Sequence, residues 1–118
     1  MRIGVLLGST SQGVLGHELK QARVVPAPSL AAAAEMLKRS ELDALPTNKA
    51  VLFELADGLP GARVLAGRWG LEHLAIAVPK GRTVAAPYLR DFAESVTREG
   101  LVQSAANRAG LRGTAETP

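Results

Sequence analysis

The sequence predicts an α/β fold in three layers, with a mostly parallel five-stranded sheet and helices on both of its faces. Two observations favour this fold. Short apolar segments alternate along the chain with segments whose apolar residues recur at helical spacing. Hydrophobic residues make up 47% of the 118 residues but aromatic residues only 3%, so Ala, Val and Leu must fill the core. A chain of this length can form one modest core.

The first elements are two strands, each followed by a helix. Residues 2–7 are apolar without polar alternation, which is typical of a strand covered on both faces. A helix over residues 11–20 is expected after the Gly-Ser-Thr corner. Residues 22–27 form the second predicted strand, and Ser29 stands where a helix N-cap is expected. The next helix is predicted from the apolar positions Leu30, Ala33, Ala34 and Leu37.

The middle of the chain predicts a third strand and a third helix. The strand is expected over residues 43–46, with Pro46 at its end because proline has no N–H for the ladder. Thr47 or Asn48 is expected to cap the helix, which ends within the Gly-Leu-Pro-Gly sequence of residues 58–61. Its apolar face is formed by Val51, Leu52, Leu55 and Ala56.

The last part of the chain predicts two more strands and then two helices. The strands are expected over residues 63–66 and 74–78, and they complete the five. A long amphipathic helix follows from residue 84 to Gly100, and a shorter one covers residues 101–109. The long helix carries an apolar stripe of Val84, Tyr88, Leu89, Phe92 and Val96.

Composition excludes several classes of function. The 14 Lys and Arg exceed the 11 Asp and Glu by three, but the basic residues are scattered singly and form no stripe. With one Trp, one Tyr and two Phe there is no stacking platform either, so we expect no nucleic-acid partner. The chain has no cysteine, which excludes disulfides and thiolate metal sites. No apolar run approaches the roughly 20 residues of a membrane span.

Polar residues follow the first and third predicted strands. Ser9, Thr10 and Ser11 come after the first strand, and Thr47 and Asn48 after the third. Because the carboxyl ends of parallel strands meet at one edge of a sheet, we expect both groups at the same rim, where ligands bind in such folds. N–H groups and hydroxyls at a helix start suit a carboxylate. The alternative interpretation is that Ser9 or Thr10 is only an N-cap.

No catalytic arrangement is evident, so we expect a protein that is not an enzyme and needs no cofactor. The corner lacks the Lys-Ser/Thr of a phosphate loop and the Gly-x-Ser-x-Gly of a nucleophile elbow. His17 and His73 are isolated and form no metal site with a third ligand. A small transferase or hydrolase is the weakest alternative, because no base or metal set is present.

Several segments, in chain order, match the motifs of one known family. They include the GST corner within residues 2–12, the Glu-Leu-Asp-Ala of residues 41–44, the LAIAVPKG of residues 74–81, and the Arg-Glu-Gly-Leu of residues 98–101. Together they resemble the polar-amino-acid group (family 3) of the substrate-binding proteins of bacterial ABC importers, specifically the second lobe of the type II periplasmic binding fold and the helices after it. The resemblance runs across nearly the whole chain.

The resemblance implies a domain division. Residues 1–82 would be the solute-binding second lobe, residues 83–112 the helices that return to the first lobe, and residues 113–118 a frayed tail. The first lobe is missing, as in a truncated gene product or an excised lobe. A complete protein would bind a small carboxylate-bearing solute such as an amino acid, partner an ABC permease and work in the periplasm.

The resemblance also implies roles for site residues. Ser9 and Thr10 match the positions that hold the solute α-carboxylate, with Ser11 and Thr47 beside them. Asn48 falls where the family has a carboxylate for the α-amino group. A neutral amide cannot offset an ammonium charge, so either the solute is not an α-amino acid or first-lobe groups hold its amine.

Two further expectations concern assembly and setting. The stripe of the long helix would normally pack on the first lobe, and without it we expect a homodimer through the C-terminal helices. The competing hypothesis is a cytoplasmic effector-sensing or regulatory domain on the same fold. An authentic start at Met1 would favour that hypothesis, and an upstream signal peptide and first lobe would favour the periplasmic one.

Overall fold

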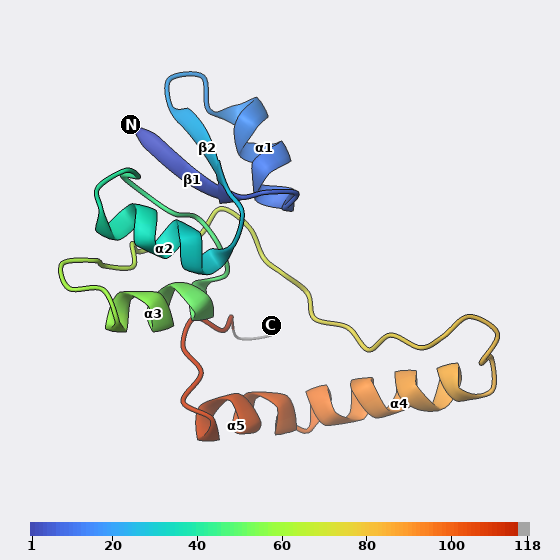
Figure 1. Ribbon diagram of the computed structural model, residues 1–118. Helices are drawn as coiled ribbons and strands as arrows, with labels where there is room; N and C mark the ends of the chain where they lie inside the picture. Colours follow the sequence, from blue (N-terminus) through green and yellow to red (C-terminus); the bar gives the residue numbers. More distant parts are fainter. Residues whose placement is uncertain (116–118) are drawn as a thin grey trace. The chain divides into compact units, whose positions relative to one another are not determined.

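The computed structural model describes residues 1–115, which fall into two compact units (Figure 1). The first unit is Met1–Leu65 and the second begins at Ala66. The division at residues 82 and 83, which concerns a complete two-lobed protein, stays a prediction. The end of the predicted frayed tail, residues 116–118, lies outside the described residues.

The first unit contains the sheet. Strand β1 (Arg2–Leu6) pairs with β2 (Arg23–Ala27) in parallel, with Ile3 opposite Val24. Helix α1 (Thr10–Glu18) makes the crossover between them. The predicted α/β class with a parallel pair of strands is therefore confirmed. The order of strand, helix, strand and helix continues into α2 (Leu30–Lys38), where Ser29 Oγ accepts the N–H of Ala32 at 3.1 Å as predicted for an N-cap.

The other edge of β1 is also occupied, so β1 lies in the middle. Ala44 forms a parallel bridge with Ile3, and the Gly4 N–H donates to the Ala44 carbonyl at 2.8 Å. The predicted third strand over residues 43–46 is thus reduced to this single bridge. Pro46 has no N–H to continue the pairing, and the chain turns at once into α3 (Lys49–Asp57).

The segments predicted as the fourth and fifth strands form no strand in the described residues. Residues 63–66 and 74–78 have no ladder, and Leu74 is 95% exposed. A strand needs a neighbour for its backbone N–H and C=O groups. None is supplied to these segments within the described residues, so the sheet has two strands and one bridge.

Both faces of this small sheet are packed. On one face Ile3 and Val5 contact Leu15 of α1. On the other face Ala27 and Leu45 pack with Ala33 of α2, and Leu55 of α3 joins them. Successive side chains of a strand point to opposite faces, so an apolar strand without alternation serves both clusters. The buried hydrophobic residues are Ile3, Val5, Leu15, Ala27, Ala33, Leu42 and Leu45.

Pro26 closes the outer edge of β2. The N–H of Arg23 donates to the carbonyl of Met1, which directly precedes β1, so the N–H of every second residue from Arg23 faces β1. Position 26 is the outward one, and proline provides no donor to a further strand. Any additional strand would therefore pair at the edge of the sheet that contains Ala44.

The second unit contains α4 (Ala85–Arg98) and α5 (Leu101–Arg108), joined through Gly100 with φ of 72°. Glycine adopts this left-handed conformation readily, and the conformation ends α4 before α5 begins. None of residues 66–115 is buried. No helix in the described part of the chain is long and apolar enough to cross a membrane.

Candidate functional site

The two polar corners belong to the same edge of the sheet. Strand β1 and the bridge at Ala44 run in parallel, so the helices that follow them both start at the carboxyl edge. Figure 1 shows the first turns of α1, α2 and α3 on the side where β1 and β2 end. The parallel topology is therefore compatible with the prediction that both corners lie at one rim of the sheet.

The corner after β1 is built by a glycine and a capping residue. Gly8 has φ of 76°, a conformation that side chains rarely adopt, and it turns the chain from strand to helix. Ser9 is the N-cap of α1, and its Oγ accepts the N–H of Gln12 at 3.3 Å. The Gln12 Oε1 accepts the N–H of Gly8 at 2.8 Å. This reciprocal pair resembles a capping box and fixes the corner.

Two backbone donors at this corner have no partner in the described residues. They are the N–H groups of Thr10 and Ser11, the first two residues of α1. Their hydroxyls make no hydrogen bond there either, whereas the Ser9 N–H already donates to Leu6 at 3.0 Å. The positive end of the α1 dipole lies at the same place. The corner thus offers two N–H groups and two hydroxyls to an acceptor.

The second corner is also a helix cap. Asn48 Oδ1 accepts the N–H of Ala50 at 3.0 Å, which makes Asn48 the N-cap of α3 rather than Thr47. Its carbonyl oxygen is therefore held by the helix. Thr47 is half-buried, and its hydroxyl has no hydrogen bond in the described residues. Of the five predicted site residues, two are caps, and Thr10, Ser11 and Thr47 keep hydroxyls for a ligand.

An ion pair fixes the Ala44 edge at the opposite end of β1. The Asp43 carboxylate accepts the Arg2 backbone N–H at 2.5 Å and its guanidinium at 2.9 and 3.2 Å. The hydrogen bonds from the Arg2 side chain and backbone lower the pKa of Asp43 to about 2, and the same pairing raises the pKa of Arg2. Asp43, the residue before the bridge at Ala44, is therefore held beside Arg2 at the start of β1.

We expect acid to weaken the first unit through Asp43. Its pKa is about 2 in the folded chain and near 3.8 when unfolded, so the stabilisation is present above pH 4 and is lost as the pH falls toward 2. Asp43→Asn should flatten the fall in unfolding free energy over this interval. Urea unfolding at pH 2–5, followed by the amide NMR signals of β1, measures it. Glu54→Gln, which removes an exposed carboxylate on α3, is the control; an equal flattening there would contradict the assignment.

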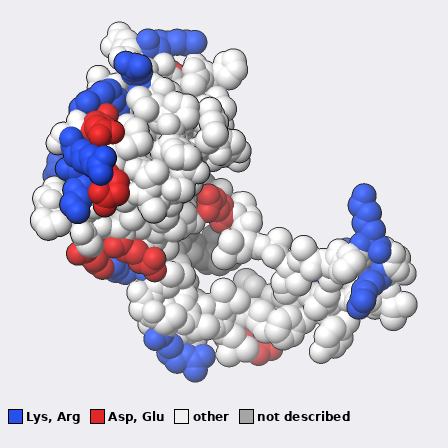
Figure 2. Space-filling view, viewed as in Figure 1, with Lys and Arg blue, Asp and Glu red and all other residues white. Residues whose placement is uncertain are grey.

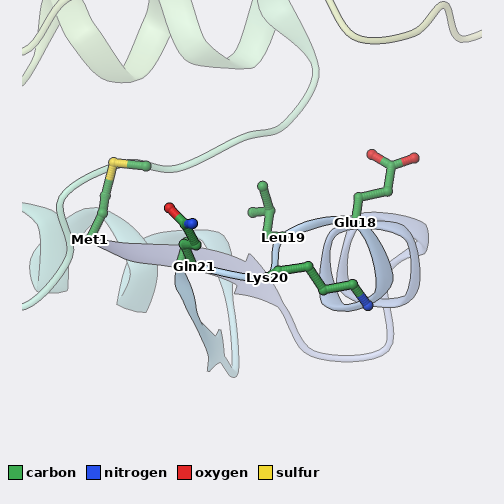
Figure 3. A pocket seen from close by; sticks show the side chains of 6 residues that line it. Met1, Glu18, Leu19, Lys20 and Gln21 are labelled. Atoms are coloured by element: carbon green, nitrogen blue, oxygen red, sulfur yellow. The ribbon is translucent and has the colours of Figure 1, made fainter.

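A hollow of about 460 Å³ lies at the amino edge of the sheet, away from both corners (Figure 3). It is lined by Met1 at the start of β1 and by residues 18–22 between α1 and β2. In Figure 3 the Met1 and Gln21 side chains stand beside each other over the strands, while Lys20 and Glu18 extend away. It is wide open, so it offers a ligand little enclosure.

Charges do not mark a second site. Figure 2 shows Lys and Arg interleaved with Asp and Glu over the visible face of the first unit. Among residues 1–115 no group of three or more His, Asp or Glu could hold a metal ion. The two polar corners are thus the features of the sheet edge that suit a small ligand.

Two residues of these features were not singled out by sequence reasoning. Gln12 completes the cap, and the spacing Ser-x-x-Gln was a local signal that could have identified it. Asp43 pairs with Arg2 across 41 residues of sequence, and no local pattern indicates such a contact.

No family model matches the chain, and searches of curated proteins and of solved structures found no similar protein.

Proposed function

We propose that the first unit binds a small carboxylate-bearing solute at the carboxyl edge of its sheet, as one lobe of the solute-binding component of an ABC import system. The observation that carries this proposal is the pair of unpartnered N–H groups of Thr10 and Ser11 at the start of α1. The motif resemblance, from the GST corner to the Arg-Glu-Gly-Leu sequence of residues 98–101, supports the same function.

The chemistry of the corner favours a carboxylate. Its two oxygens can accept from the Thr10 and Ser11 N–H groups at once, and the neighbouring hydroxyls can donate as well. Hydrogen bonds to a charged group contribute about 1.5–3 kcal/mol each. The reciprocal cap between Ser9 and Gln12 holds the corner in place before a ligand arrives, which reduces the ordering cost of binding.

The second corner disfavours a strong amine contact. Asn48 is neutral, and its oxygen already caps α3. We therefore propose that this lobe recognises the carboxylate end of the solute, while groups outside this chain recognise the other end. Enclosure between two lobes removes most of a ligand from water, so the chain by itself should bind more weakly than the complete protein.

The same proposal includes the five-stranded sheet that the sequence predicts. Residues 63–66 and 74–78 are apolar apart from Arg63, and most of them are exposed. Each segment is long enough to form a strand. Because Pro26 closes the edge of β2, they would add beyond Ala44, giving five strands in three layers. The ABC permease partner and the periplasmic setting belong to this proposal as well.

Replacing Thr10 with Pro tests the proposal at one residue. Proline is accommodated at the first helical position, and the extended Ser9 with ψ of 158° suits a residue before proline. The change removes the Thr10 N–H and hydroxyl but should leave α1 intact, so we expect carboxylate affinity to fall about tenfold to a hundredfold. Amide NMR titration of Ser11 with small carboxylates measures it.

The control is Thr10→Ser, which keeps the N–H and the hydroxyl and should bind as the parent does. Far-UV circular dichroism checks that α1 is retained in both variants. If Thr10→Pro binds carboxylates as well as Thr10→Ser does, the start of α1 is only a capped helix end and the proposal is wrong.

A further inference from the structure

Helix α4 presents an apolar stripe that nothing else in the described part of the second unit covers. Val84, Tyr88 and Phe92 recur every four residues and are 92%, 72% and 49% exposed. Within the second unit, α5 packs against α4. Figure 2 shows mostly uncharged surface over α4, with Lys and Arg gathered near one end. Soluble proteins rarely leave such a continuous apolar stripe in water.

Two opposite charges flank this stripe on the same side. Asp91 and Arg98 are seven residues apart, so they lie on one flank of α4. Neither side chain has an ion-pair or hydrogen-bond partner in the described residues. An inverted copy of this helix would place each charge opposite its counterpart, so the surface is complementary to itself.

We propose that α4 is a self-association surface, in which two copies of this chain pair their α4 helices antiparallel about a two-fold axis between Glu94 and Ser95. Asp91 of each copy then lies beside Arg98 of the other, and Phe92 packs against the stretch from Ala93 to Val96 of the other copy. This proposal uses the second unit alone and does not rest on solute binding by the first.

The axis position follows from the charges. The midpoint of Asp91 and Arg98 falls between residues 94 and 95, which sets the register of the two helices. Ser95 lies between the stripe and this flank, so the two Ser95 residues come close together at the axis. The two Val84 residues lie at opposite ends and are about 30 Å apart at 1.5 Å rise per residue. A parallel pair would instead bring the two Val84 residues together.

Single-cysteine cross-linking tests this register, and the absence of native cysteine makes it unambiguous. In the full chain under mild oxidation, Ser95→Cys should give a covalent dimer and Val84→Cys should not, because a disulfide requires Cα atoms within about 7 Å. Cross-linking of Val84→Cys, or failure of Ser95→Cys to cross-link, would overturn the antiparallel pairing.

Charge exchange tests the flank independently. Asp91→Lys and Arg98→Glu should each weaken dimerisation about tenfold, because each change affects both symmetric contacts. The double variant restores opposite charges and should recover the parent's dissociation constant within a few-fold. Arg90→Glu is the control, since Arg90 lies on the face opposite Phe92. Equal weakening by Arg90→Glu, or no recovery in the double variant, would overturn the proposed contact.

Light scattering at tens of micromolar decides whether the surface associates at all. The parent should be a dimer, and Phe92→Glu should be a monomer with its helical circular dichroism retained. Loss of helix in that variant would leave the charge-exchange series to decide, because its changes are on the helix surface. A parent that stays at 12.3 kDa would show that α4 does not bind its own copy and would overturn the proposal.

Discussion

Leu45→Ala is expected to lower the unfolding free energy of the first unit by about 2–5 kcal/mol. Leu45 is 8% exposed and packs with Ala27 of β2 and Ala33 of α2. The two buried neighbours are alanines, and partly buried longer side chains, among them Leu55 of α3, surround the cluster. Incomplete movement of these side chains into the space left by the leucine would leave a cavity. The total stability of such a small unit is a few kcal/mol, so this one change should leave much of it unfolded at room temperature.

The measurement is urea unfolding of the full chain, followed by the amide NMR signals of β1. Leu7→Ala is the matched control, because Leu7 directly follows β1 but is 66% exposed, and it should change the unfolding free energy by less than about 0.5 kcal/mol. Equal effects of the two variants would contradict the core assigned to Leu45.

Gly4→Val is expected to destabilise the same unit by about 3 kcal/mol. Gly4 lies in β1, between β2 and the segment that contains Ala44. A Cβ added to Gly4 would stand 2.5 Å from Leu42 Cδ1. Leu42 is 3% exposed and has little room to move away. Glycine is therefore required at this strand position by close packing.

A double-mutant cycle checks this contact. Leu42→Ala removes the clashing methyl group, so Gly4→Val should cost much less in the Leu42→Ala background than alone. The same urea experiment measures all four proteins. Additive effects of the two substitutions would show that the valine is rejected for another reason.

Local signals in the sequence were enough for the helices and for two strands. Ser29 and Asn48 precede apolar residues at helical spacing, and both cap helices in the structure. Residues 2–7 and 22–27 carry enough apolar residues to form both faces of a strand, and β1 and β2 lie within them. Capping and periodicity act over a few residues, so one sequence contains the information.

Elements that depend on a distant neighbour could not be predicted in the same way. Residues 74–78 have the composition of a strand, but a strand forms only when another backbone accepts and donates its hydrogen bonds. The Asp43–Arg2 pair aligns segments 41 residues apart, and nothing near either residue indicates it. The five-stranded sheet remains a prediction.

The candidate site was likewise predictable only in part from the sequence. The spacing of Ser9, Thr10 and Ser11 after a strand predicted their place at a helix start, and the parallel topology brings Thr47 and Asn48 to the same edge. Which of these residues caps a helix and which keeps free donors depends on the local geometry. Ser9 and Asn48 are the caps, and Thr10 and Ser11 keep their N–H groups.

The central claim is that the start of α1 binds a carboxylate, and an NMR titration tests it most directly. The full chain is titrated with amino acids and organic acids, each compared with its neutral amide. We expect the Thr10 and Ser11 amide signals to shift and saturate with carboxylates in the millimolar range, on the order of −4 kcal/mol, and to stay unmoved with the amides. Unmoved Thr10 and Ser11 signals, or equal shifts with carboxylates and their amides, would contradict the account.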